Sequence, residues 1–176
     1  MLYDGLAKLM YEKSFHSITV TDLVETAQVG RATFYRNFDE IGDILHLRSD
    51  QVFEELIAYF VSYVQENGIE SRTTLLKPLL RYFYLHSEVI ELLMKAKRLD
   101  IVHSSFRRAL EPFKAIAALR YDVDETDFEY VQAIRIGLAI NILIHWIETG
   151  KKEAPDVLAD RLGALLEEIG QLEQLL

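Results

Sequence analysis

The chain of 176 residues contains no cysteine. This absence excludes disulfides, thiolate zinc sites and redox sensing by cysteine. Proline and glycine are also scarce, with three and eight copies, and the alternating pattern of half-buried strands is missing. Because apolar residues recur instead at helical spacing along the whole chain, we predict an all-α protein with short connections.

Long apolar runs are missing as well. The most apolar stretch, Ile134 to Ile147, is interrupted by Arg135, Asn141 and His145 and is shorter than the ~20 residues that a membrane-spanning helix needs. The first helix mixes charged with apolar residues, unlike a signal peptide. We therefore expect a cytoplasmic protein with no membrane partner, and we interpret the apolar stretch as a buried or interface helix.

Basic residues are too few to make the chain a general binder of polyanions. The formal net charge is −9. The first 48 residues hold five basic and seven acidic side chains, a net charge of −2, and the remaining residues carry −7. Any binding to DNA must therefore depend on a few well-placed cations and not on a broad basic surface.

One segment, Ile18 to Leu45, has the order of elements of a helix-turn-helix. Thr19 is suited to cap a first short helix, and Asp22 stands three residues later, where the second member of a capping box belongs. After a short turn, Phe34 and Phe38 recur at a spacing of four, which places both on the buried face of a second helix. The segment therefore predicts a helix-turn-helix.

The side chains around these two phenylalanines offer guanidinium, hydroxyl and amide groups together with one small apolar contact. Such groups suit phosphates and base edges. An ordinary solvated helix face would contain similar residues, but the capping box, turn and aromatic spacing occur together here, so we favour contact with DNA. The candidates on this helix are Arg31, Ala32, Thr33, Tyr35, Arg36 and Asn37.

The segment TFYRNF, residues 33 to 38, follows a helix that ends in Lys13-Ser14-Phe15 and precedes a long helix. In this setting it resembles the DNA-binding domain of the TetR family of transcriptional regulators. The resemblance implies a three-helix DNA-binding domain in residues 1 to 46, here called the reader. It also implies a larger helical effector-binding and dimerisation domain in residues 47 to 176, and double-stranded operator DNA as a partner.

The resemblance also implies roles for single residues. Arg31, Thr33 and Arg36 would reach bases or nearby phosphates. Tyr35 would pack on the sugar-phosphate backbone, and Thr19 would offer its hydroxyl group to a phosphate.

Three positions depart from the family pattern. Gln28 stands where a glycine is usual in the turn, and Gly30 stands where serine or threonine usually caps the recognition helix. Ile41 replaces a lysine that commonly holds a phosphate, and the stretch from Asp39 to Asp43 contains no cation. We therefore expect a disfavoured turn conformation, a weaker cap and the loss or replacement of one phosphate contact.

The rest of the chain is predicted to be helical. A long helix runs from about residue 43 to 65 and stops at Asn67-Gly68, a pair suited to a left-handed cap. Further helices are predicted over residues 73 to 86, 88 to 97, 101 to 121 with a break at Pro112, 128 to 149 and 155 to 172, and the acidic residues 122 to 127 are predicted to form a loop.

Small residues four apart mark the last two helices, where an interior glycine costs about 1 kcal/mol relative to alanine. Close approach of another helix would offset that cost, and two helices from each of two protomers would form a four-helix bundle around a two-fold axis. The family resemblance implies the same homodimer, while packing within one chain is the alternative. The predicted interface residues are Ala133, Gly137, Asn141, His145, Ala159 and Gly163.

Residues that could enclose a small-molecule effector lie in the middle helices, where aromatic walls with a few polar groups are expected. They are Tyr82, His86, Met94, His103, Phe106 and Arg107. The histidines show no metal-binding spacing, and no phosphate-loop, hydrolase or dinucleotide motif occurs. We therefore expect no metal, no cofactor and no catalysis.

The predicted function is a TetR-like DNA-binding transcriptional regulator, a ligand-responsive repressor that binds a palindromic operator as a homodimer. The alternative is a TetR-like interaction protein with weakened DNA binding that acts through a protein partner. The acidic charge and Ile41 would allow this alternative.

Overall fold

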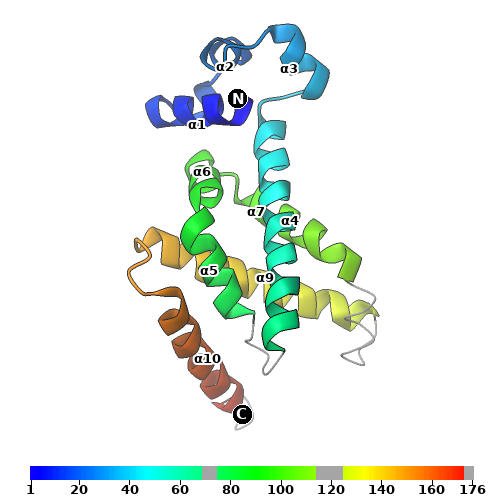
Figure 1. The fold of residues 1–176 in the computed structure, drawn as a ribbon, viewed down its shortest axis with the longest axis vertical. Coiled ribbons are helices and arrows are strands. Elements are labelled where there is room, and N and C mark those ends of the chain that lie inside the picture. The colour runs from blue at the N-terminus through cyan, green and yellow to red at the C-terminus, as the bar shows by residue number, and fades with distance from the viewer. Residues whose placement is uncertain (69–74, 114–124, 173–176) are drawn as a thin grey trace. The chain divides into compact units, whose positions relative to one another are not determined.

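The computed structural model describes residues 1 to 68, 75 to 113 and 125 to 172, which form helices and contain no strand (Figure 1). The all-α prediction is confirmed. In chain order the elements are α1 (Leu2–Glu12), the 3-10 helix η1 (Phe15–Ser17), α2 (Val20–Thr26), α3 (Arg31–Asn37), α4 (Gly42–Asn67), α5 (Leu76–His86), α6 (Glu88–Ala96), α7 (Leu99–Leu110), the 3-10 helix η2 (Glu111–Phe113), α9 (Glu125–Glu148) and α10 (Pro155–Leu172).

The chain divides into two compact units. The first unit contains Met1–Glu54 and Glu88–Ile136, and the second contains Glu55–Ser87 and Gly137–Leu176. Helices α4 and α9 each contribute residues to both units. These units are defined by contacts between residues and are not the functional domains predicted from the sequence. The predicted boundary between a DNA-binding domain (residues 1 to 46) and an effector-binding domain (residues 47 to 176) stays a prediction.

The first unit brings α1 directly onto the end of α2. Gly5 is buried in α1, and a Cβ atom added there would lie 3.0 Å from the Cβ of Ala27. Elsewhere in this unit the rings of Phe53 and Phe106 stack with centroids 5.0 Å apart, and Arg108 donates to Asp50 at 2.6 Å. Close packing thus holds α1 on α2, and aromatic stacking holds α4 on α7.

The second unit pairs α5 with α10, which lie side by side (Figure 1). Lys77 forms an ion pair with Asp160 at 2.7 Å, and Arg81 donates through Nε and Nη2 to both carboxylate oxygens of Asp156 at 2.6 and 2.7 Å. The two basic residues and the two acidic residues are each four apart, so they face one another turn by turn. The Arg81 hydrogen bonds hold the pKa of Asp156 below its usual range.

The helix boundaries agree with the sequence patterns except at a few ends. The predicted break at Pro112 is confirmed, because α7 ends at Leu110 and η2 follows. The predicted continuation to residue 121 and the predicted helix start near residue 73 lie outside the described residues. The loop prediction for residues 122 to 127 was wrong at its end, since α9 already begins at Glu125, where acidic residues favour a helix N-terminus.

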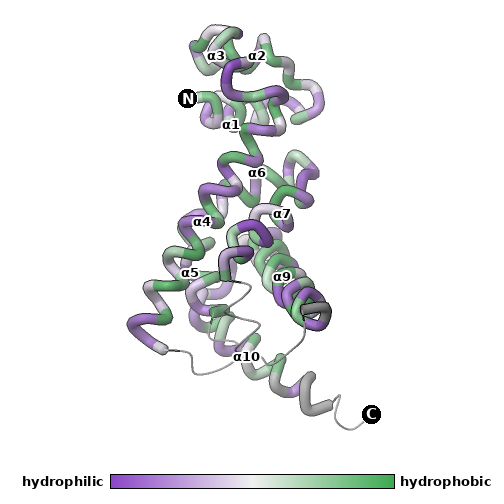
Figure 2. The backbone as a smooth tube through the Cα atoms, turned by 90° about the vertical axis from the view of Figure 1, so that its right-hand side faces the viewer, coloured by the Kyte–Doolittle hydropathy of each residue, from purple (hydrophilic) through white to green (hydrophobic). Residues whose placement is uncertain are grey.

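Helix α9 is the most apolar element, and much of it is green in Figure 2. By length and composition alone its stretch Asp127–Glu148 could cross a membrane, which corrects the sequence argument that no stretch is long enough. One such helix is weak grounds for a membrane span, because core helices of soluble proteins pass the same test. Ile134 is 69% exposed and Leu138 is 40% exposed within the described chain. The helix therefore presents apolar side chains that the described residues leave uncovered.

Candidate nucleic-acid interface

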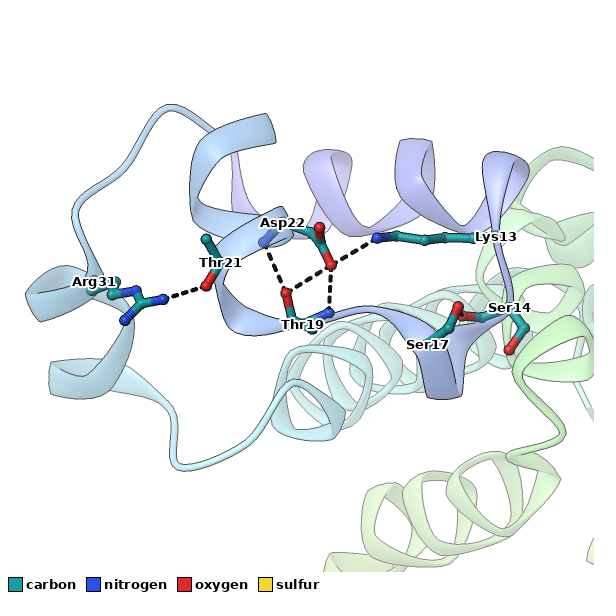
Figure 3. A network of polar contacts seen from close by, with 7 residues as sticks. All are labelled: Lys13, Ser14, Ser17, Thr19, Thr21, Asp22 and Arg31. Atoms are coloured by element: carbon teal, nitrogen blue, oxygen red, sulfur yellow. Dashed lines mark hydrogen bonds and ion pairs between the residues drawn. The ribbon is translucent and has the colours of Figure 1, made fainter.

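The start of α2 carries the predicted capping box, which the structure confirms. The backbone N–H of Asp22 donates to Oγ1 of Thr19 at 3.2 Å, and the backbone N–H of Thr19 donates to Oδ2 of Asp22 at 2.8 Å. The Thr19 hydroxyl donates to the same Oδ2 at 2.7 Å (Figure 3). The single hydroxyl hydrogen of Thr19 is therefore already engaged, and a phosphate would have to displace Asp22 to receive it.

Lys13 adds a contact to this cap that the sequence argument missed. Its Nζ lies 2.7 Å from Oδ2 of Asp22 (Figure 3). The hydrogen bonds from Lys13 and from Thr19 hold the pKa of Asp22 far below its usual range. The sequence did hold a signal for this ion pair, because a lysine ends one helix and an acid lies in the first turn of the next. The ion pair ties α1 to α2 and occupies a cation of the reader.

The turn between α2 and α3 has the left-handed residue that was expected at Gln28, whose φ is 54°. The N–H of Val29 donates to the carbonyl of Val24 at 3.0 Å, and the N–H of Gln28 donates to the carbonyl of Glu25 at 3.2 Å. These two bonds form a Schellman motif, in which glycine is the usual left-handed residue. The prediction that Gln28 occupies a disfavoured conformation is confirmed.

Helix α3 buries its aromatic side and exposes its polar side. Phe34 is fully buried, and its ring lies 6.0 Å from that of Phe38. Gly30 is the N-cap and provides no side-chain hydrogen bond, so the expected weak cap is confirmed. Of the six candidates on this helix one is half-buried, Thr33, and the others are exposed: Arg31, Ala32, Tyr35, Arg36 and Asn37.

Two of these candidates are held within the reader. Nη2 of Arg31 donates to Oγ1 of Thr21 on α2 (Figure 3). Nδ2 of Asn37 donates to the carbonyl of Thr33 at 2.7 Å. Arg36 has no hydrogen bond or ion pair with any described residue. The structure thus presents one tethered and one untethered arginine on the same helix, and their contact with DNA stays a prediction.

The acidic stretch after α3 is partly explained by its local structure. Oδ2 of Asp43 accepts the backbone N–H groups of Asp39 and Glu40, both at 2.9 Å. Asp43 therefore shapes the connection into α4 by satisfying two donors ahead of a helix start. Ile41 is half-buried, and the connection itself contains no basic residue. A cation from elsewhere in the chain lies nearby, since Nη1 of Arg98 is 3.3 Å from the position of a Cβ added at Gly42.

Comparison with known proteins identifies the family. A family model described as "Bacterial regulatory proteins, tetR family" matches residues 2–46. A second model, described as "Transcriptional regulator C-terminal region" and named for TetR, matches residues 70–168, which is more than half of the chain. The chain belongs to the TetR family. The family prediction and the predicted TetR-like architecture are confirmed, and the family is one of DNA-binding transcriptional regulators.

A solved structure has the same fold as this TetR-family chain. The crystal structure of Lin0861 from Listeria innocua superposes with a TM-score of 0.77 over 96% of this chain and 88% of that chain. The two sequences are 18% identical, so the likeness concerns the fold alone. No curated protein matches the chain.

The predicted dimer residues of this TetR chain differ in exposure. Ala133, Asn141 and His145 are exposed, Gly137 is half-buried, and Ala159 is buried at 4% exposure by its own chain. Gly163 on α10 is half-buried as well. Nδ2 of Asn141 donates to the carbonyl of Gly137 at 2.7 Å, within α9.

Gly137 has space around it. Within the described chain nothing lies within 4 Å of a Cβ added there. Packing among the described residues therefore does not explain this glycine, whereas it does explain Gly5. The approach of a second copy to α9 stays a prediction.

The predicted effector residues fall into both units. In the second unit, the hydroxyl of Tyr82 donates to Oε2 of Glu55 at 3.0 Å, and its ring lies 4.5 Å from that of His86. The other four candidates lie in the first unit: Met94 is half-buried, Phe106 is buried against Phe53, and His103 and Arg107 are exposed. Neither unit alone brings the six together, and a common effector site stays a prediction.

A metal site finds no support in the part of the chain that the structure describes. No group of three or more histidine, aspartate or glutamate side chains is placed there to hold an ion. The carboxylate of Asp22 is already bound by the ammonium group of Lys13 and the hydroxyl group of Thr19. These contacts have a structural role in the reader.

Proposed function

We propose that this TetR-family protein is a ligand-responsive repressor that binds a palindromic operator as a homodimer in the cytoplasm. The observation that carries the proposal is the exposed polar face of α3, which a buried Phe34 and a capped α2 hold in a helix-turn-helix. Two such helices, related by a two-fold axis, would enter successive major grooves.

The charges of the reader set the strength of DNA binding. Its four basic side chains are Lys8, Lys13, Arg31 and Arg36. Lys13 and Arg31 are bound within the reader, while Lys8 and Arg36 have no partner among the described residues. Few condensed counterions would be released on binding. The affinity for DNA would therefore depend less on salt than is usual for a DNA-binding protein.

Helices α9 and α10 are proposed to form the dimer interface. Leu138 on α9 is 40% exposed, and Val157 and Leu165 on α10 are 62% and 44% exposed. Burial of such side chains against the same surfaces of a second copy would stabilise a four-helix bundle. A monomeric mass in solution at micromolar concentration would count against this interface.

The effector is proposed to act by differential binding. It would favour a dimer conformation in which α4, which continues from the reader, holds the two α3 helices at the wrong spacing for the operator. Aromatic and polar side chains such as those of Tyr82 and His86 would contact it. The chemistry of the effector is left open.

A second candidate function is an interaction protein that has lost most of its DNA affinity. The absence of a cation from Asp39 to Asp43, and the engagement of Lys13 by Asp22, favour it. In this case the TetR-family architecture would serve a protein partner and not an operator.

Binding to DNA from upstream of the protein's own gene separates the two functions. Wild type and Arg36→Ala would be compared at low salt, with thermal melting as a check that both fold. Tighter binding by wild type supports a DNA-binding repressor. Equal, weak binding by both proteins would remove the DNA-binding proposal and favour the interaction protein.

A further inference from the structure

The two arginines of α3 differ in how they are held. Nη2 of Arg31 donates to Oγ1 of Thr21, which lies in the first turn of α2, so this hydrogen bond crosses from one helix of the motif to the other (Figure 3). Arg36 lies in the last turn of the same helix, is also exposed and has no partner among the described residues. The two arginines therefore differ in their side-chain contacts, although they lie on the same helix.

A tethered guanidinium is suited to reading a base. Arginine has a long, flexible stem, and a hydrogen bond to a fixed hydroxyl restricts the positions of its planar head before DNA arrives. One of its five N–H donors is engaged by Thr21, which leaves enough donors for a bidentate pair with O6 and N7 of guanine. Residues near the N-terminus of a recognition helix are those that reach base edges.

We propose that Thr21 is a positioning residue that presents Arg31 to a guanine in each operator half-site, while the untethered Arg36 contacts the phosphate backbone. The proposal rests on the proposed function, because it needs a specific DNA complex. It divides the recognition helix into a residue that determines specificity and a residue that contributes affinity.

The test measures base preference position by position with the full-length protein. Wild-type protein first selects its preferred sites from a library of random-sequence duplex DNA. Relative affinities for single-base changes in the selected site are then measured for wild type, Thr21→Val, Thr21→Ser, Arg31→Ala and Arg36→Ala. Thr26→Val is the matched control, since Thr26 is a half-buried threonine at the opposite end of the same helix.

We expect Arg31→Ala to abolish a preference for guanine at one position in each half-site. Thr21→Val should lower the preference at that same position about 3- to 10-fold, the loss of one positioning hydrogen bond, and leave the other positions unchanged. Thr21→Ser, which keeps the hydroxyl, should restore the preference, and Thr26→Val should behave as wild type. Arg36→Ala should weaken binding to all sequences alike.

Several results would overturn the proposal. One such result is that Thr21→Val has the same base preferences as Thr26→Val, and another is that Thr21→Ser is as defective as Thr21→Val. Either result would show that the hydroxyl does not position Arg31. A uniform loss of affinity in Arg31→Ala would show that Arg31 does not read a base. If wild type selects no sequence at all, the proposed function fails, and this outcome is distinct from the others.

Folding of the variants is checked by thermal melting. Thr21 is only half-buried, and valine keeps its β-branched shape, so the melting midpoint should stay close to that of wild type. If Thr21→Val melts lower, Thr21→Ala replaces it, with the same expected loss of guanine preference and the same result counting against the proposal.

Discussion

Replacing Gly137 with alanine separates the packing of α9 within one chain from its packing against a second copy. A glycine inside a helix is less favourable than alanine by about 1 kcal/mol. Nothing in the described chain lies within 4 Å of the added methyl group. In the isolated chain, Gly137→Ala should therefore raise the free energy of unfolding by about 1 kcal/mol, a rise of roughly 2 to 4 °C in the melting midpoint.

The same methyl group should weaken the proposed dimer. If a partner helix approaches the backbone at Gly137, the inserted methyl would overpack the interface at a cost of about 1 to 3 kcal/mol. Since 1.4 kcal/mol corresponds to a tenfold change, the dissociation constant would rise by roughly 5-fold to 140-fold. The two effects have opposite signs, which makes the substitution informative.

Sedimentation over a range of concentrations would measure the dissociation constant, and thermal melting at a concentration below it would measure the single chain. Leu138→Ala is a useful companion, because it removes exposed apolar surface next to Gly137 without adding volume. A dimer as tight in Gly137→Ala as in wild type would refute close helix approach at this residue, whatever the stability of the single chain.

Four smaller predictions concern the reader. Gly5→Ala should lower the free energy of unfolding by about 1 kcal/mol, because overpacking against Ala27 outweighs the gain in helix propensity, as a denaturant titration would show. Gln28→Gly should raise it by about 0.5 kcal/mol, since a left-handed cost of about 1 kcal/mol is partly offset by the entropy of an unfolded glycine; an unchanged midpoint would contradict this. Because the pKa of Asp22 is lowered in the folded protein, its ionised carboxylate stabilises the fold above the usual carboxyl pKa, and this stabilisation is lost as pH falls below that value. Asp22→Asn should therefore flatten the acid side of a plot of unfolding free energy against pH. With two free basic side chains per protomer, log K against log salt should have a slope of about −3.6, and a slope near −8 would disagree.

The helical fold and the recognition helix could be predicted because both depend on local sequence. Capping by Thr19 and Asp22, and the i to i+4 spacing of Phe34 and Phe38, are set within a few residues of the chain. The unusual turn at Gln28 was predictable for the same reason, since its left-handed backbone follows from the helix end.

Contacts between helices could not be predicted in the same way. The close packing at Gly5 could not be predicted from the sequence, because only the structure shows that α1 meets α2 at Ala27. The partners of Lys13 and Arg31 depend on where a long side chain turns after its helix is placed. The effector candidates were predicted to enclose one small molecule, whereas Tyr82 and Phe106 belong to different units.

The contacts within the reader give it two opposing properties. The ion pair of Lys13 with Asp22 fixes α1 against α2, and the bond of Arg31 to Thr21 fixes α2 against α3, so the motif is ordered before it meets DNA. The same contacts occupy two of its four basic side chains. A reader built in this way should gain specificity from preorganisation while it gives up general attraction to the phosphate backbone. The proposed dimer then becomes essential to DNA affinity, since two weakly charged readers joined rigidly would bind far more tightly than either alone.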